Sequence, residues 1–106
     1  MPVIDTRQLA VLDKRPGWRG RVFHSASMTF AHWDFDAGST IHEHHHEQEE
    51  VWHVLEGELE VTIDGAAHLA RPGMVAIVPA EALHSVRAVS DGNAIVVDHP
   101  SRADFA

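Results

Sequence analysis

Residues 38–57 read GSTIHEHHHEQEEVWHVLEG, and both the expected fold and the expected site are built around them. Half of the chain's 10 histidines fall in this segment, interleaved with glutamates: His42, His44, His45, His46 and His53. Imidazole nitrogens and carboxylate oxygens are ligands that first-row divalent metals prefer. Side chains at i and i+2 of an extended chain point to the same side. The sequence therefore predicts that His44 and His46 bind one metal ion together.

The second half of the segment predicts a strand that returns beside the first. Residues 47–49 form a short polar break, and residues 51–55 are an apolar run typical of a strand. A turn at the polar break places Glu50 at the start of the returning strand, where its carboxylate reaches the same ion. Glu56 and Gly57 then predict the turn that ends the strand.

The spacing of these residues resembles the first motif of the cupin superfamily. Gly38, the pair His44 and His46, then Glu50 and Gly57 stand at the family's intervals, so residues 38–57 fill every position of that motif. Two motifs in register are a more specific signal than either motif alone. A second motif at the family's distance downstream would therefore make the resemblance much more specific.

A second motif that resembles the cupin pattern covers residues 73–88. It begins at Gly73, continues to Pro79 and reaches His84. Two positions depart from the family, because Glu81 stands where glycine is usual and Ala88 where asparagine is usual. Neither position binds metal in the family, so the resemblance of the ligand set is complete.

The resemblance implies a metal site made of three histidines and one glutamate: His44, His46, Glu50 and His84. The remaining coordination positions would hold water or substrate, which is the arrangement that chemistry at a metal requires. The chain has no cysteine, so histidine and carboxylate are its strong metal donors. The expected cofactor is one divalent ion of iron, nickel, manganese or zinc.

Short strands separated by Gly, Pro, Asn and Asp predict an all-β protein, and the resemblance implies an antiparallel double-stranded β-helix, or jelly-roll barrel. We expect residues 1–106 to form a single domain. Residues 1–20 are predicted to be a packing arm with one short strand or helical turn and Trp18 as its anchor. The further predicted strands cover residues 21–24, 28–35, 58–63, 66–70, 74–78, 84–89 and 94–98. Residues 101–106 are expected to be a polar tail.

The charge and composition exclude several classes of function. With 8 basic and 16 acidic residues the net charge is -8, which argues against binding to nucleic acid or to an anionic membrane. No apolar run is long enough to span a bilayer and no signal peptide is evident, so we expect a soluble, cytoplasmic protein. The arginines are scattered along the chain, and no phosphate clamp is expected.

Several side chains near the motifs are further candidates for the site. Trp52 and Val54 share the predicted face of Glu50 and are expected to form the pocket wall. His42 shares the predicted face of His44, and its role is open between outer ligand, proton carrier at the rim and solvated histidine. His45 is expected to be exposed.

Two more residues are candidates for a catalytic role, although the sequence identifies no catalytic residue. Glu81 precedes His84 closely and is either a loop carboxylate in water or a general base at the metal. His32, with Asp34 on the same face of its strand, either lines the cavity or orients a ligand histidine.

These features favour a metal-dependent enzyme that acts on a small organic molecule, either dioxygenase-like or a non-redox lyase, isomerase or cyclase. One alternative is a module that senses or stores a small molecule, with the metal orienting it. Another is a purely structural metal. We also expect a homodimer, because Val51 and Leu55 lie on the face of their strand opposite to the ligands, and His53 on that face is expected to serve packing or an interface.

Overall fold

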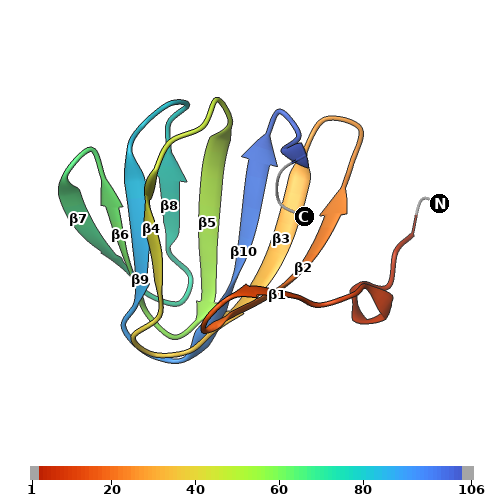
Figure 1. Ribbon diagram of the computed structural model, residues 1–106, viewed down its shortest axis with the longest axis horizontal. Coiled ribbons are helices and arrows are strands. Elements are labelled where there is room, and N and C mark those ends of the chain that lie inside the picture. The colour runs from red at the N-terminus through yellow and green to blue at the C-terminus, as the bar shows by residue number, and fades with distance from the viewer. Residues whose placement is uncertain (1–2, 104–106) are drawn as a thin grey trace.

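The computed structural model describes residues 3–103, and in this part of the chain ten strands form two antiparallel sheets (Figure 1). The larger sheet has the strand order β1-β2-β3-β10-β5-β8, and the smaller has the order β4-β9-β6-β7. The strands are β1 (Leu12–Arg15), β2 (Trp18–His24), β3 (Thr29–Phe35), β4 (Thr40–His44), β5 (Glu49–Glu56), β6 (Leu59–Ile63), β7 (Ala66–Ala70), β8 (Val75–Val78), β9 (His84–Ala88) and β10 (Gly92–His99). The predicted all-β antiparallel jelly roll is confirmed.

The core lies between the two sheets and follows the alternation of side chains along each strand. On β10, Ala94 and Val96 are buried, and they lie opposite Val54 and Trp52 of β5. The smaller sheet contributes Val61 and other buried aliphatic residues from β6 and β9. The period of two seen in the sequence thus places one face of each sheet in a common interior.

The hairpin predicted from Asp64 and Gly65 is confirmed. Strands β6 and β7 pair directly across this turn, with Ile63 opposite Ala66. Both turn residues have positive φ, 48° for Asp64 and 83° for Gly65. A two-residue turn with positive φ at both positions matches the right-handed twist of the strands, which is why Asp-Gly is favoured there.

The N-terminal arm contains both of the elements that were expected as alternatives. A short 3-10 helix, η1 (Thr6–Gln8), is capped by the side chain of Asp5, and β1 pairs with β2. The arm was expected to extend to residue 20, but the barrel strand β2 already begins at Trp18. The indole of Trp18 is fully buried against Phe35, with the ring centroids 5.5 Å apart. The first two residues of the arm lie outside the described residues.

The outer face of the larger sheet carries the residues on which the expected homodimer rests. Val51 is half-buried, whereas Leu55 is 43% exposed and His53 is exposed on the same face. The homodimer stays a prediction, which light scattering at several protein concentrations would check. No helix among residues 3–103 has the length and apolar character needed to cross a membrane.

Candidate functional site

The four residues of the expected metal set meet between the two sheets, near one end of β5. His44 on β4 lies directly opposite His84 on β9 in the smaller sheet, and their ring centroids are 4.3 Å apart. His46 lies in the connection from β4 to β5, and Glu50 stands near the start of β5 in the larger sheet. The folding of the chain therefore brings the two sequence motifs to a single point.

The three histidines are oriented in the same way by the backbone. In each ring Nδ1 lies within hydrogen-bond distance of a carbonyl oxygen two residues away, at 2.8 Å for His44, 3.1 Å for His46 and 2.9 Å for His84. A carbonyl oxygen only accepts, so Nδ1 donates and carries the proton. In a neutral ring this leaves the lone pair on Nε2, the form in which imidazole binds a metal.

The donor atoms fit a divalent ion. Ring nitrogens of His44, His46 and His84 lie within 4.8 Å of one another. Nε2 of His46 is 3.4 Å from one carboxylate oxygen of Glu50, and Nε2 of His84 is 3.3 Å from the other. Two ligands bound at about 2.1 Å from one ion are separated by roughly 3.0–3.4 Å. The Nε2 atoms of His46 and His84 are buried and make no hydrogen bond within residues 3–103. Their role as ligands stays a prediction that this geometry supports.

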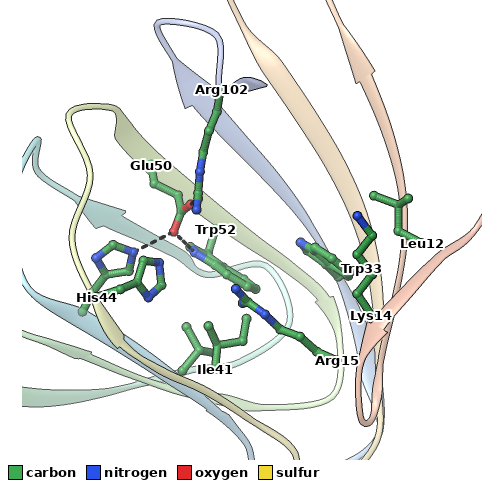
Figure 2. A pocket seen from close by; sticks show the side chains of 11 residues that line it. Leu12, Lys14, Arg15, Trp33, Ile41, His44, Glu50, Trp52 and Arg102 are labelled. Atoms are coloured by element: carbon green, nitrogen blue, oxygen red, sulfur yellow. Dashed lines mark hydrogen bonds and ion pairs between the residues drawn. The ribbon is translucent and has the colours of Figure 1, made fainter. Parts of the chain in front are cut away.

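Glu50 is held as a buried carboxylate. It is 2% exposed, and the indole Nε1 of Trp52 donates to its Oε2 at 2.7 Å, while Nη1 of Arg102 donates to its Oε1 at 3.3 Å (Figure 2). Burial alone raises the pKa of Glu50, but the adjacent imidazoles of His46 and His84 and the hydrogen bond from Trp52 outweigh it, so the pKa lies well below its ordinary value. The group is thus kept in the charged form that a cation requires.

The protonation of two of the histidines differs. Burial lowers the pKa of His44. Burial also opposes the charged form of His84, but the adjacent Glu50 carboxylate and the nearby carbonyl of Ala82 outweigh it, and the pKa of His84 is raised. Without a metal, His84 is therefore protonated at a higher pH than His44.

Two residues of the site were missed in the sequence analysis. Asp98 on β10 lies directly opposite Glu50 and is fully buried, with Oδ2 at 3.9 Å from Nη1 of Arg102. Arg102 is anchored by its backbone amide, which donates to Oγ1 of Thr29 at 2.8 Å. The expectation of a polar tail from residue 101 is therefore wrong for Ser101 and Arg102, because hydrogen bonds tie the backbone of both residues to the barrel. Residues 104–106 of that tail lie outside the described residues.

A cavity of about 120 Å³ adjoins the four-residue cluster. It is lined by apolar side chains, by three of the four residues of the expected metal set and by cations: Leu12, Trp33, Ile41, Trp52, Val86, His44, Glu50, His84, Lys14, Arg15 and Arg102. Trp52 lines this cavity as expected. Val54 is fully buried in the core and is not part of the cavity wall, because it lies two residues further along β5.

A bulge in β4 alters the expected position of His42. Ile41 pairs with Val86 and His44 pairs with His84, so the two residues between them on β4 match a single residue of β9. Both Ile41 and His44 therefore face the interior and line the cavity, and the assumed alternation fails between them. His42 is exposed and does not line the cavity, although its ring centroid is 5.7 Å from that of His44.

The other two catalytic candidates lie away from the cavity. The side chain of Glu81 is 65% exposed, and its Oε1 is 3.2 Å from Nδ1 of the exposed His45. Its φ of 65° is left-handed, which explains why glycine is usual at this position in the family. His32 lies opposite Ile95 and Arg21 on the outer face of the larger sheet and lines a different, shallow pocket with Asp34. The structure thus supports neither residue as a catalytic group at the cluster.

Replacing Trp52 by phenylalanine tests how the carboxylate is held. Phenylalanine retains an aromatic ring but removes the donor to Glu50, so we expect metal-free Trp52→Phe to lose about 1.5–3 kcal/mol of unfolding free energy. We also expect about tenfold weaker zinc binding, because the carboxylate is no longer oriented. Urea unfolding and competition titration with a zinc-binding dye measure the two effects. An unchanged zinc affinity would contradict an orienting role for the indole.

Comparisons with known proteins agree with this fold. A family model described as a cupin domain matches residues 31–100. An RmlC-like cupin from Shewanella frigidimarina is 24% identical, with a TM-score of 0.92 over 100% of this chain and 96% of that one. KdgF from a Halomonas species is 24% identical, with a TM-score of 0.88 over 96% of each chain. A variant of the oxalate decarboxylase of Bacillus subtilis is 16% identical, with a TM-score of 0.84 over 97% of this chain and 30% of that one. No curated protein matches the chain.

Proposed function

The chain belongs to the cupin domain family, and from this membership and the four-residue cluster we propose that it is a metal-dependent enzyme acting on a small organic molecule. The proposed cofactor is one divalent ion of iron, nickel, manganese or zinc, held by His44, His46, Glu50 and His84. The observation that carries the proposal is the convergence of inward-facing imidazoles and one charged carboxylate beside a cavity.

The cavity supports a reactive site over a purely structural one. A structural metal site is closed by protein ligands, whereas a catalytic site leaves positions for water or substrate. Here His44, Glu50 and His84 all line the cavity, so a small molecule in the cavity would reach a metal ion that these residues bind. The structural neighbours include an oxalate decarboxylase, so the fold supports catalysis in one relative.

The chain's own residues would prepare the site for such a molecule. A divalent ion, when bound, supplies Lewis-acid or redox chemistry at this position. Glu50 would offset part of its charge, while Trp52 orients the carboxylate. Ile41 and Trp33 give the cavity apolar walls that limit the entry of water.

Elemental analysis of protein purified without a histidine tag tests the proposal. We expect about one equivalent of a first-row divalent metal per chain. Loaded protein should then transform a small substrate, and oxygen uptake with catechols, diketones or flavonols separates the redox branch from lyase, isomerase or cyclase chemistry. Failure to retain any of the four ions after reconstitution would contradict the proposal. A retained metal with tight ligand binding but no turnover would favour a sensing or storage module.

A further inference from the structure

Basic side chains gather at the cavity although the chain is acidic overall. The chain has 8 lysines and arginines against a net charge of -8, and three of the eight line this cavity: Lys14, Arg15 and Arg102. Lys14 and Arg15 come from β1, and Arg102 comes from the segment after β10. Segments almost ninety residues apart in sequence thus place three positive charges at one small cavity. We interpret this local excess of positive charge as a feature of the cavity.

Two of the three cavity cations, Lys14 and Arg15, differ from most of the other basic residues in their pairing. Four arginines elsewhere in the described chain have an acidic side chain within salt-bridge distance: Arg7, Arg19, Arg71 and Arg87. Arg21, which lines a different pocket, has none in this part of the chain. Lys14 and Arg15 have no such partner among residues 3–103, yet both line the cavity, and Arg15 points toward Trp52 and Ile41 (Figure 2). Their positive charge is therefore available to a ligand.

Arg102 is the cation closest to the cluster. Its Nη1 lies 3.3 Å from Oε1 of Glu50, the oxygen that is also 3.4 Å from Nε2 of His46. The same Nη1 lies 3.9 Å from Oδ2 of the buried Asp98. If Glu50 binds a metal ion, as the proposed function requires, the ion takes over part of the charge that Arg102 now neutralises. A guanidinium has five N–H donors, so Arg102 can keep its contact with Asp98 and still direct donors to a ligand, and a guanidinium forms its most specific contacts with a carboxylate.

The remainder of the wall is apolar and aromatic. Leu12, Trp33, Ile41 and Val86 offer contact to a carbon skeleton rather than to a small inorganic ion. The volume of about 120 Å³ is close to that of a cavity that binds benzene, roughly 150 Å³. A ligand that satisfies both parts of the lining has a compact apolar body and one negative charge.

We propose that the cavity binds small organic monocarboxylates, with Arg102 and Arg15 holding the carboxylate and the apolar wall holding the carbon skeleton. The part played by Arg102 rests on the proposed function, because a metal ion bound by Glu50 would weaken the ion pair between Glu50 and Arg102. The positive charge contributed by Arg15 and Lys14 does not depend on the metal.

Calorimetric titration of the full chain, metal-free and zinc-loaded, tests this assignment with isobutyrate and benzoate as probes and with their neutral amides as counterparts. We expect each acid to bind at least about tenfold more tightly than its amide, because charge-assisted hydrogen bonds are lost with the amide. Zinc loading should strengthen binding of the acids. Arg15→Gln and Arg102→Gln should each weaken binding of the acids about tenfold in the zinc-loaded protein and leave the amides unchanged.

The control variant is Arg87→Gln, which removes one positive charge from the outer side of β9, where Arg87 is 3.6 Å from Glu60. We expect its affinities to stay within twofold of the unmodified chain. Melting curves verify folding, and Arg15 is exposed and makes no contact with Glu50, so it remains a valid test if Arg102→Gln is unstable.

The outcomes separate this inference from the proposed function. Zinc retained with equal affinity for acid and amide, or with unchanged affinity in both arginine variants, would overturn the inference and leave the metal site standing. Inorganic phosphate bound as tightly as benzoate would also overturn it, because the apolar wall would then contribute nothing. Failure to retain zinc would count against the proposed function, while selectivity for the acids in the metal-free protein would still support the charged cavity.

Discussion

His46→Ala is expected to lose at least a hundredfold in zinc affinity while the barrel remains folded. A four-ligand zinc site contributes about 10–16 kcal/mol at neutral pH, so each ligand is worth roughly 3–4 kcal/mol, or a few hundredfold in affinity. His46 lies in the connection between β4 and β5, outside the strand pairing, so its removal spares the sheets. Competition titration gives the affinity, and circular dichroism with urea unfolding gives the state of the fold.

His45→Ala is the matched control. The two histidines are adjacent, but the side chain of His45 is 62% exposed and contacts Glu81, whereas the side chain of His46 is 9% exposed and contacts Glu50. We expect His45→Ala to bind zinc as the unmodified chain does, within about twofold, which is the scatter expected for surface changes. Equal losses of zinc affinity in the two variants would show that zinc binds to the histidine-rich segment in general, not to the four converging side chains. That result would contradict the proposed ligand set.

Much of the barrel was predictable because its signals are local. The alternation in residues 58–63, the Asp64 and Gly65 turn and the apolar run before Pro79 each depend on neighbours within a few residues, and each strand appears where it was expected. The convergence of His84 with His44 and His46 is not local. It was expected only because two spaced motifs resemble a family whose barrel joins them, and the structure brings these residues together.

The departures arise where tertiary structure overrides a local rule. The parity that placed His42 beside His44 fails because a bulge adds one residue to β4 against β9. Arg102 could not be assigned from a polar C-terminal segment, since its position depends on the anchoring of that segment at Thr29. Asp98 did leave a signal. It shares a face of β10 with the buried Ala94 and Val96, and a carboxylate in an apolar row marks a site.

Gly57→Ala is expected to destabilise the metal-free chain by about 3 kcal/mol, although the residue touches no ligand. Its φ is 78°, which costs an L-residue about 1 kcal/mol. A Cβ at this position would also stand 2.2 Å from the carbonyl oxygen of Asp91 and 2.9 Å from Cα of Gly92. Both are backbone atoms, so the turn after β5 and the turn before β10 would have to separate, and overpacking of this kind costs a further 1–3 kcal/mol.

Gly38→Ala separates the two causes, because Gly38 belongs to the same motif and has nearly the same φ, 84°, but a Cβ there would meet nothing within 4 Å. We expect this control to lose only about 1 kcal/mol, from φ alone. Urea unfolding of both metal-free variants measures the difference, and equal losses would contradict a steric role for Gly57. A larger loss at Gly57 would mean that the last glycine of the motif serves closure of the barrel. Within residues 38–57, the histidines would then serve metal binding and the last glycine would serve backbone packing. Gly57→Ala would therefore weaken zinc binding only to the extent that it unfolds the chain.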